Sequence, residues 1–425
     1  MMKVLVISRA PWRNDNNTGN TLTNLFSDLA DVELYSLCMR EQPPQNNLAE
    51  RHFFISEMQM IRRLMGKKTV IGQENSPESV DQGSEKAIYD AVKKHPSTIM
   101  LAARELLWSI GGWRNGNLKR YIEEVEPDVI FFPVFGCYYP HKLLQYIHSL
   151  CDARIVLFHT DDHYTLKQFS LSPLYWWYRF GLRKWVRRSA RLSDIQYCIS
   201  EVQKVDYDRM LDGECKVLTK FADFSDEPSL KTAWGDPLQL VFTGNININR
   251  WKSLSMLAKV LERINRDGVK AQLRVYTMTP LTGDMRKALD KENTSFLMGS
   301  VPSTEVSRIQ SEADILVLAE PTDLKNRLIV RQSFSTKIVD YLKAARPIVA
   351  IGPKEVASIK HFVDHDCAIV ADNEQELYEK LTSVLDDAQQ LQAYAMQAYM
   401  CGRNNHDKKQ QNAMLQQDLL RLTAT

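Results

Sequence analysis

Short apolar runs alternate with amphipathic stretches along nearly the whole chain of 425 residues. Each run predicts a buried strand, and the stretches between the runs have the period of a helix. Strands separated by helices pair in parallel, so this order predicts an α/β fold of the doubly wound type. The predicted strands are residues 4–8, 32–36, 128–132, 154–158 and 196–199 in the first half, and 238–243, 272–276, 315–318, 347–351 and 368–371 in the second.

A polar segment at residues 224–237, which contains two prolines, separates these two groups of strands. A new strand begins directly after it, so we predict one domain over residues 1–230 and a second over residues 231–425. Between the second and third predicted strands lie about ninety residues, far more than one crossover helix needs. This length indicates an insertion around residues 40–125, with a polar loop at 72–84.

Composition narrows the class of protein only a little. The chain is 44% hydrophobic and 25% charged with a net charge of +2, so attraction to phosphate or to a membrane requires local patches. The seven cysteines include no CxxC pair, which favours a reducing compartment and argues against a disulfide framework and a structural zinc. The first apolar run ends at Ile7 and Arg9 follows, so it reads as a strand and not as a signal peptide. No apolar run approaches the roughly 20 residues that span a bilayer, and we expect a cytoplasmic protein.

The most informative segment is residues 333–352, SFSTKIVDYLKAARPIVAIG, which predicts a helix followed by a buried strand. Ser335 or Thr336 can cap this helix, and Lys337 and Asp340 fall on its polar face near the start. The amides of a helix start and a lysine bind phosphate, and a carboxylate one turn later accepts hydrogen bonds from ribose hydroxyls. These residues therefore predict a site for the nucleoside diphosphate of a nucleotide sugar.

The same segment resembles a known family. Its order S-T-K-I-V-D-Y-L, small residues and P-I-V-A is similar to the donor site of GT-B glycosyltransferases, in particular the retaining family 4, the group 1 glycosyl transferases. Many members carry two glutamates separated by seven residues, and the second binds the ribose. Gln332 and Asp340 occupy these positions here, and Gln332 supplies hydrogen bonds but no negative charge. The resemblance implies two Rossmann-like domains facing across a cleft, with the Gln-rich end at 410–422 packing back on the first domain.

The end of the strand at 238–243 carries a second group of candidates. Gly244 has no side chain and lets the backbone come close to a ligand. The family places arginine and lysine after this glycine to bind the diphosphate, and this chain has Asn245, Arg250 and Lys252 there. The resemblance thus implies that these residues contact the donor. The alternative is that both cations are solvated in the first turn of a helix.

Gly19 lies in the loop after the first strand, at the sheet edge where open α/β sheets bind ligands. The family uses this loop to approach donor and acceptor, so the resemblance implies a donor contact for Gly19. The alternative is a capped helix start with a flexible loop, and the absence of any GxGxxG motif weakens a dinucleotide-binding interpretation. Residues 296–321 resemble the base-contacting segment of the family, with a turn at 299–302 that would approach the base.

His159 ends the fourth predicted strand, and Asp161 and Asp162 follow it. Similar glycosyltransferases carry a functional histidine at this point, so the resemblance implies that His159 contacts sugar hydroxyls or the acceptor, with Asp161 within reach. The alternative is that these residues cap the following helix. We expect no metal here, because the i and i+4 spacing of His159 and His163 aligns ligands only on a helix, and this segment reads as a loop.

Residues 174–192 predict a helix that is both basic and aromatic. Aromatic rings interleaved with arginines suit an anionic membrane interface or a polyanionic acceptor, whereas the alternative is a buried connecting helix with a basic outer face. We do not expect nucleic acid as a partner. The candidate membrane or acceptor patch consists of Trp176, Arg179, Arg183, Lys184, Arg187 and Arg188.

Together these features predict a glycosyltransferase of the hexosyltransferase type. The resemblance implies that it moves a sugar, with retention of configuration, from a nucleoside diphosphate sugar to a glycan or lipid-linked acceptor in polysaccharide or glycoconjugate biosynthesis. We expect no cofactor beyond the donor, and peripheral attachment at the inner face of a membrane is a further expectation. The two alternatives are a GT-B-shaped binding protein without catalysis and a nonhydrolysing sugar-nucleotide epimerase.

Overall fold

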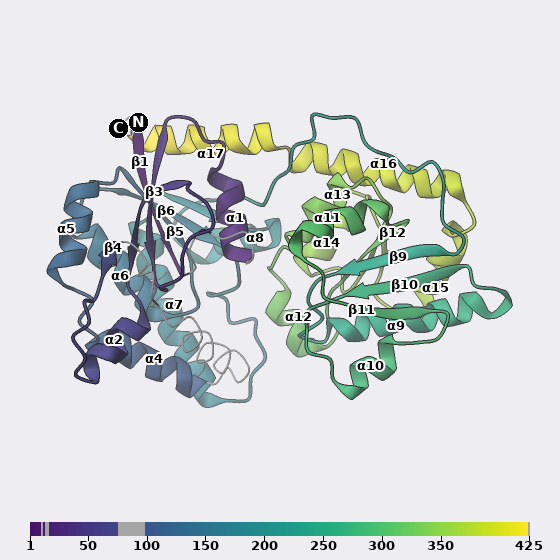
Figure 1. The fold of residues 1–425 in the computed structure, drawn as a ribbon, viewed down its shortest axis with the longest axis horizontal. Coiled ribbons are helices and arrows are strands. Elements are labelled where there is room, and N and C mark those ends of the chain that lie inside the picture. Colours follow the sequence, from purple (N-terminus) through teal and green to yellow (C-terminus); the bar gives the residue numbers. More distant parts are fainter. Residues whose placement is uncertain (10–11, 13–16, 75–97, 424–425) are drawn as a thin grey trace.

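The computed structural model describes residues 1–9, 12, 17–74 and 98–423, which form two sheets lying side by side, each flanked by helices (Figure 1). The eight strands of the first sheet follow the order β4-β3-β2-β1-β5-β6-β7-β8, and the six of the second follow β11-β10-β9-β12-β13-β14. All neighbouring strands are parallel except β3 and β4. Both sheets therefore confirm the predicted α/β class with two doubly wound, Rossmann-like halves.

The first sheet consists of β1 (Met2–Ser8), β2 (Val32–Cys38), β3 (Ala49–Phe54), β4 (Gln73–Glu74), β5 (Val129–Pro133), β6 (Arg154–His159), β7 (Ile195–Cys198) and β8 (Cys215–Val217). Its helices are α1 (Asn17–Phe26), α2 (Glu57–Leu64), α4 (Thr98–Ile110), α5 (Gly116–Val125), α6 (Tyr138–His148), α7 (Pro173–Leu192) and α8 (Glu201–Met210).

The second sheet consists of β9 (Leu238–Thr243), β10 (Ala271–Tyr276), β11 (Ser295–Gly299), β12 (Ile315–Ala319), β13 (Ile348–Ile351) and β14 (Ile369–Ala371). Its helices are α9 (Arg250–Ile264), a 3₁₀ turn (Asn265–Asp267), α10 (Gly283–Leu289), α11 (Ser303–Glu312), α12 (Leu324–Val330), α13 (Lys337–Lys343), α14 (Ala357–Asp364), α15 (Glu374–Val384), α16 (Ala388–Asn405) and α17 (Lys408–Thr423).

All ten predicted strands are present, because a parallel strand covered on both faces is a continuous apolar run that the sequence displays openly. The central strands β5 and β12 are buried at every position. Among the described strands, four were not predicted: β3, β4, β8 and β11, which lie at or next to sheet edges and are short or contain polar residues. The expected insertion at 40–125 needs correction, because β3 extends the main sheet. Most of the predicted loop at 72–84 lies outside the described residues.

In both sheets the strand order reverses at one point, between β1 and β5 in the first sheet and between β9 and β12 in the second. Helices that leave such a pair of strands depart to opposite faces, and the carboxyl ends of the strands are left accessible to a ligand. Gly244 follows β9 and Glu320 follows β12, the two strands at the reversal of the second sheet. The loop after His159 follows β6, which lies next to β5 and so is not one of the two strands at the reversal of the first sheet. The topology therefore places the predicted site residues at the carboxyl edges of both sheets.

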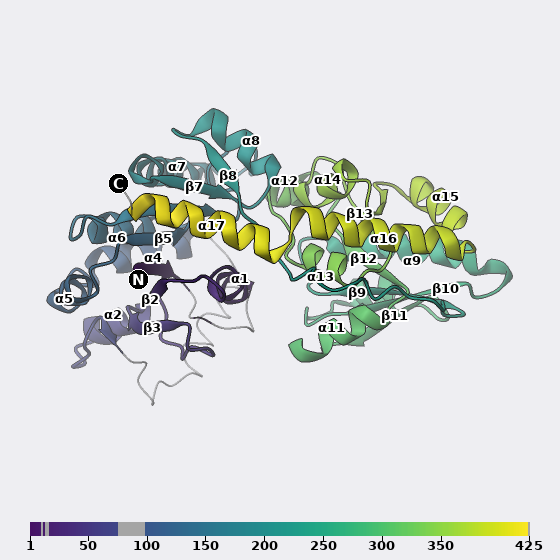
Figure 2. The same cartoon turned by 90° about the horizontal axis from the view of Figure 1, so that it is seen from above.

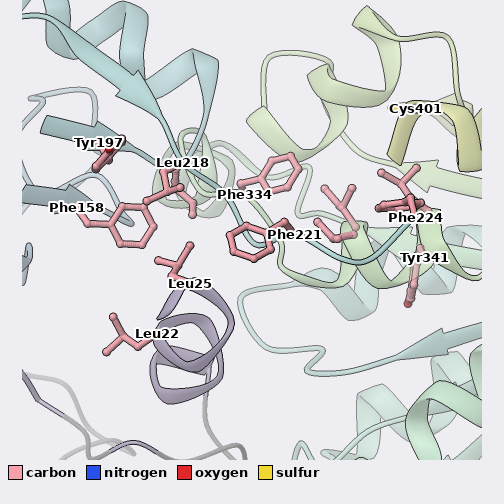
Figure 3. Packing of buried hydrophobic residues seen from close by; sticks show 14 of the residues in the cluster. Leu22, Leu25, Phe158, Tyr197, Leu218, Phe221, Phe224, Phe334, Tyr341 and Cys401 are labelled. Carbon is pink, nitrogen blue, oxygen red and sulfur yellow. The ribbon is translucent and has the colours of Figure 1, made fainter. Parts of the chain in front are cut away.

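The two halves share one apolar core at their junction (Figure 3). Leu218 and Phe221 of the connecting segment are fully buried, with Leu25 of α1 on one side and Phe334 on the other. The same cluster continues into both sheets. Burial of this much apolar surface ties the linker to both halves, so the junction is a packed interface and not a loose tether.

The chain crosses the junction a second time between α16 and α17, which run across both halves (Figures 1 and 2). The two crossings are hydrogen-bonded to each other, because the amide of Ala222 donates to the carbonyl of His406 at 3.0 Å and the amide of Lys408 donates to that of Ala222 at 2.9 Å. Helix α17 then packs on the first sheet, where the buried carboxylate of Asp418 accepts a hydrogen bond from the Tyr197 hydroxyl at 2.7 Å and pairs with Lys216 at 2.5 Å.

We predict that Asp418→Ala lowers the free energy of unfolding by about 2 kcal/mol, because it leaves the buried Tyr197 hydroxyl without its acceptor and Lys216 without its counter-ion. Urea denaturation measures this loss. Gln417→Ala is the matched control, since this residue is exposed on the same helix and its loss should cost less than about 0.5 kcal/mol. Equal stability of the two variants would show that α17 does not depend on this buried contact.

Candidate active site

Gly244 allows a lysine ammonium to lie against the end of β9. The glycine has a φ of +133°, and a Cβ atom there would lie 2.7 Å from Nζ of Lys337, closer than any real side chain is found. The positive φ therefore favours glycine, and any side chain at this position would displace the ammonium of Lys337. The same ammonium lies 4.4 Å from the centre of the Phe242 ring, over its negative face.

Lys337 is a cation that no described carboxylate neutralises by direct contact. Burial, with the neighbouring charge of Arg250 as a smaller cause, lowers the pKa of Lys337 to about 8, and Glu320 acts in the opposite direction. Arg250, at the start of α9, is held by Glu320, whose Oε2 lies 3.0 Å from Nε and 2.9 Å from Nη2. Two positive charges therefore lie near a single buried carboxylate at the reversal point of the second sheet. This local excess of positive charge favours an anionic ligand.

The other predicted donor residues of the second half take different positions. Asn245 accepts a hydrogen bond from the amide of Asn247 at 2.7 Å and so stabilises its own turn, and Lys252 is exposed beside the Trp251 ring. The expected helix cap is wrong: α13 begins at Lys337, and the side chain of its preceding residue, Thr336, makes no capping hydrogen bond. The amide of Ser335 instead donates to the hydroxyl of Ser358 at 3.0 Å.

Asp340, the predicted ribose ligand, is paired with a lysine of the linker. Nζ of Lys220 donates to Oδ1 of Asp340 at 2.6 Å, and the lysine side chain is only 14% exposed. The described contacts of the carboxylate engage Oδ1 alone. A ribose at Asp340 must therefore share this carboxylate with Lys220 or displace it.

Gln332 does not line the same surface as Lys337, because its side chain is fully buried at the junction of the two halves. Its Nε2 donates to Oδ2 of Asp206 on α8 at 2.6 Å, and its carbonyl accepts from the hydroxyl of Ser200 at 2.7 Å. The structure thus separates the two members of the predicted pair: Asp340 faces the linker, and Gln332 faces the first half.

His159 is also fully buried. Its Nε2 lies 3.3 Å from Oε1 of Gln196, and the edge of its ring meets Tyr207 with 4.8 Å between the ring centres. Burial lowers the pKa of His159 to about 4, so the ring is neutral near pH 7. A sugar cannot touch this side chain in the present arrangement, so the expected contact needs correction: His159 supports the loop that follows it.

Asp161, two residues later, is one of the side chains of that loop that reach the second half. Its Oδ1 accepts a hydrogen bond from the hydroxyl of Ser333 at 2.8 Å, and its carbonyl accepts from Nε2 of Gln203 at 3.0 Å. The carboxylate is open to solvent but surrounded by protein on other sides. This desolvation, with a smaller contribution from the charge of Asp162, raises the pKa of Asp161, while Ser333 and Arg250 act in the opposite direction.

The basic patch predicted on residues 174–192 is smaller than expected. Arg179 is buried and pairs with Asp162 at 2.8 Å, so it holds the loop after β6 and cannot reach a membrane. Arg183 and Arg187 both turn toward Tyr164, the first to its carbonyl and the second to its hydroxyl. These contacts anchor α7 to the loop, which the sequence could not reveal because the direction of each arginine depends on how the irregular loop folds against the helix.

The outer face of α7 nevertheless combines apolar and cationic side chains. Trp177 is 64% and Phe180 56% exposed, and Lys184 and Arg188 continue the same face at helical spacing. Trp176 is half-buried and donates from Nε1 to the carbonyl of Ser170 at 2.9 Å. The exposed stripe therefore begins with two aromatic rings and ends with cations.

Two further positions remain to be placed. Gly19 is buried in the first turn of α1, and the turn at 299–302 follows β11 at the outer edge of the second sheet. Among the residues that the structure describes, no three or more His, Cys, Asp or Glu side chains are grouped to hold a metal ion. Within the same residues, no helix has the length and apolar character needed to cross a membrane.

The sequence of the second half matches the model of a known protein family. The model of the family described as glycosyl transferases group 1 matches residues 237–387, which contain Gly244, Arg250, Lys337 and Asp340. Over these residues the chain is similar to the group 1 glycosyl transferases. The family recognised from the donor segment is thus confirmed for the second half of the chain. No curated protein matches the sequence significantly.

Solved glycosyltransferase structures share the fold over the whole chain. HepE from Anabaena, in complex with UDP, has a TM-score of 0.64 and 12% identity, with 99% of this chain and all of that chain covered. Sucrose-phosphate synthase from Thermosynechococcus elongatus has a TM-score of 0.64 and 9% identity, with both chains fully covered. The trehalose-6-phosphate protein of E. coli, bound with UDP-2-fluoro glucose, reaches 0.61 and 10%, with 98% of each chain covered. The TM-scores over nearly the whole length of the chain show the GT-B fold, and the family match supports the predicted class of nucleotide-sugar glycosyltransferase.

Four residues of the site escaped the sequence analysis: Asp206, Lys220, Glu320 and Ser333. Glu320 carried a usable signal, because a carboxylate directly after a buried central strand lies at the carboxyl edge of the sheet. Asp206, Lys220 and Ser333 carried no such signal in the sequence. Their partners lie 120 or more residues away, and only the packing of the two halves brings them together.

We predict that binding of a nucleoside diphosphate weakens as pH rises above about 8, by up to about tenfold per pH unit, because Lys337 loses the proton that pairs with the diphosphate. The diphosphate is itself fully ionised over this range, so the lysine dominates the change. Calorimetric titration between about pH 7 and pH 9.5 measures the effect. Lys337→Met should bind weakly with a flat profile, and a flat profile of the unaltered protein would contradict the assignment.

Proposed function

We propose that this chain transfers a hexosyl group from a uridine diphosphate sugar to a glycan or lipid-linked acceptor, with retention of configuration. The observation that carries the proposal is the pair of cations, Lys337 and Arg250, beside Gly244 at the reversal point of the second sheet. The choice of uridine rests on HepE, whose structures contain UDP and UDP-glucose, and on the E. coli protein with UDP-2-fluoro glucose.

In the proposed reaction the bond between the anomeric carbon and the diphosphate oxygen breaks, and the acceptor oxygen bonds to the same face of that carbon. The hydroxyl proton passes to the departing diphosphate, so atoms and charge balance. Negative charge grows on the diphosphate in the transition state, and the two cations stabilise it from a fixed position. Lys337 contributes strongly because it is desolvated and has no ion-pair partner among the described carboxylates.

Two carboxylates complete the proposed site. Asp340 binds the ribose hydroxyls through Oδ2, while Lys220 keeps Oδ1. Asp161 accepts a hydrogen bond from the acceptor hydroxyl or from the transferred sugar, since it is the solvent-open carboxylate of the first half that contacts the donor segment. Desolvation raises the pKa of Asp161, so its carboxylate is a stronger hydrogen-bond acceptor and base than an exposed aspartate.

The exposed stripe of α7 favours an acceptor held at a membrane, as in the assembly of a lipid-linked glycan. Trp177 and Phe180 suit insertion between lipid headgroups, and Lys184 and Arg188 suit the anionic headgroups beside them. Leu171, just before the helix, is 88% exposed and adds to the apolar end. We therefore propose peripheral attachment through this face of α7.

The two other classes predict different products from the same donor. A binding protein without catalysis would leave a UDP-sugar intact, and an epimerase would change its sugar without any acceptor. The two departures from the family pattern are Gln332, whose amide donates to Asp206, and Asn245, which stabilises its own turn; neither contacts Lys337 or Arg250 in the described hydrogen bonds. This is the reason for preferring a transferase.

We predict that Lys337→Met lowers kcat for transfer about 100-fold, because it removes the cation that stabilises charge on the departing diphosphate. Asp340→Ala should raise the KM for the UDP-sugar about tenfold, because it removes the acceptor of the ribose hydroxyls. Release of UDP, coupled to NMR of the product, measures both effects. Lys252→Met is the matched control, an exposed lysine in the first turn of α9 whose loss should change neither constant. Unimpaired turnover of both site variants would eliminate the assignment.

We predict that the protein sediments together with anionic vesicles of phosphatidylglycerol and phosphatidylcholine. Replacing Trp177 and Phe180 with serine, or Lys184 and Arg188 with glutamate, should weaken this binding about tenfold or more, because each pair supplies one of the two attractions. Met278→Ser is the control, since it removes a side chain that is 81% exposed in the second half. Unchanged binding by both double variants would rule out attachment through α7.

A further inference from the structure

Gln332 stands where the resembling enzymes carry a glutamate, and its amide faces a carboxylate of the other half of the molecule. The distance from Nε2 of Gln332 to Oδ2 of Asp206 is 2.6 Å. Gln332 is fully buried and Asp206 is 6% exposed. The contact therefore joins α8 of the first half to the donor segment of the second, shielded from water.

Asp206 collects three donors in this position. Nζ of Lys167 donates to Oδ1 at 2.8 Å, and Arg331 and Gln332 both donate to Oδ2. Burial raises the pKa of Asp206, but these donors outweigh it and hold the pKa below its ordinary value. The group is thus a fully charged carboxylate near neutral pH, and two of its three donors come from the second half.

Further hydrogen bonds cross the junction along the same short segment. The hydroxyl of Ser200 donates to the carbonyl of Gln332 at 2.7 Å, and Nε2 of Gln168 donates to the carbonyl of Leu328 at 3.3 Å. Ser333 donates to Asp161 at 2.8 Å. Residues 328–333, which lead directly into Lys337, are thus fastened to the first half at several points.

A glutamate at position 332 would not fit this partner. Two carboxylates within hydrogen-bond distance in a buried site repel each other, and one of them must take up a proton. The amide of Gln332 avoids this conflict because it donates to the carboxylate. Glutamine at 332 and aspartate at 206 are therefore chemically matched, and the charge that resembling enzymes keep on the donor half is present here on the facing helix.

We infer that Asp206 and Gln332 form an interdomain latch that positions the donor segment. Asp206 is a positioning residue: it touches no part of the proposed donor, but it holds the segment that carries Lys337 when the two halves are closed. The inference rests on the proposed function only for its effect on donor affinity, because the latch itself is a contact between the two halves.

The closed latch is not fully satisfied. Oε1 of Gln332 and Nε of Arg331 are buried and have no hydrogen-bond partner in the part of the chain that the structure describes. Each such atom loses its water on closure and regains nothing, which reduces the net gain from the charged contacts. A latch with this balance can open to admit a substrate and release a product, whereas a fully satisfied network would hold the halves shut.

The latch is tested with Gln332→Glu, Asp206→Asn and the double variant, which exchanges the positions of carboxylate and amide. Both single variants should be more open, with a larger radius of gyration in X-ray solution scattering and faster deuterium exchange at residues 328–336. Gln332→Glu should raise the KM for UDP-glucose about tenfold. The double variant should recover most of the compactness and most of the affinity, because the hydrogen bond is restored with its polarity reversed.

Asp208→Asn is the matched control, because Asp208 lies on the same helix and pairs with Lys204, without contacting the second half. It should leave scattering and exchange unchanged, and thermal unfolding of every variant verifies that it is folded. A double variant as open as Gln332→Glu, or single variants as compact as the unaltered protein, would overturn the latch. Recovery of compactness in a protein that binds no UDP-sugar would uphold the latch and reject the proposed function instead.

Discussion

The arrangement of the molecule depends on the packed junction where the chain crosses twice between its halves. The amide of Ala222 bonds to the carbonyl of His406, and Phe221 and Phe334 belong to one apolar core that continues into both sheets. The apolar part of this junction resists separation of the two halves but allows small rotations, because apolar contacts are not directional. The polar contacts farther from the junction then decide which rotation is stable. Asp206, Asp340 and Asp161 each meet a partner from across the junction or from the linker.

Electrostatic balance explains why the donor side is the reactive end of this assembly. Buried charges near the junction are matched: Arg179 with Asp162, Arg250 with Glu320, and Asp206 with its three donors. An unmatched buried charge is costly, so a protein retains one where a ligand supplies the counter-charge. Lys337 lies in that position, with burial and Arg250 lowering its pKa to about 8. The cost of holding it there is repaid when a diphosphate binds.

Much of the fold and part of the site could be predicted from the sequence. What could not be predicted has a physical cause. Buried parallel strands such as β5 and β12 are continuous apolar runs, so their presence followed from the chain alone, whereas the order of the strands in each sheet did not. Gly244 and Lys337 carried local signals, a glycine at a strand end and a lysine at a helix start. Edge strands such as β8 and β11 did not, because an edge strand is short and half-covered. The direction of Arg179 was equally hidden: its helical face is basic, but the loop it binds is fixed by tertiary packing.

The residues that departed from the family pattern are the ones whose meaning required the structure. Gln332 has lost a negative charge, and Asp206 carries one at 2.6 Å from it. Asp340 has kept its charge, and Lys220 of the linker neutralises part of it. In both cases the environment of a donor-half residue is completed by a residue outside that half. Charged and polar groups of the second half thus have their partners in the first half and in the linker. The affinity of the second half for a nucleotide sugar must therefore depend on how those parts lie against it. That dependence couples binding of the donor to closure of the two halves through charge, without any change in the residues that touch the donor.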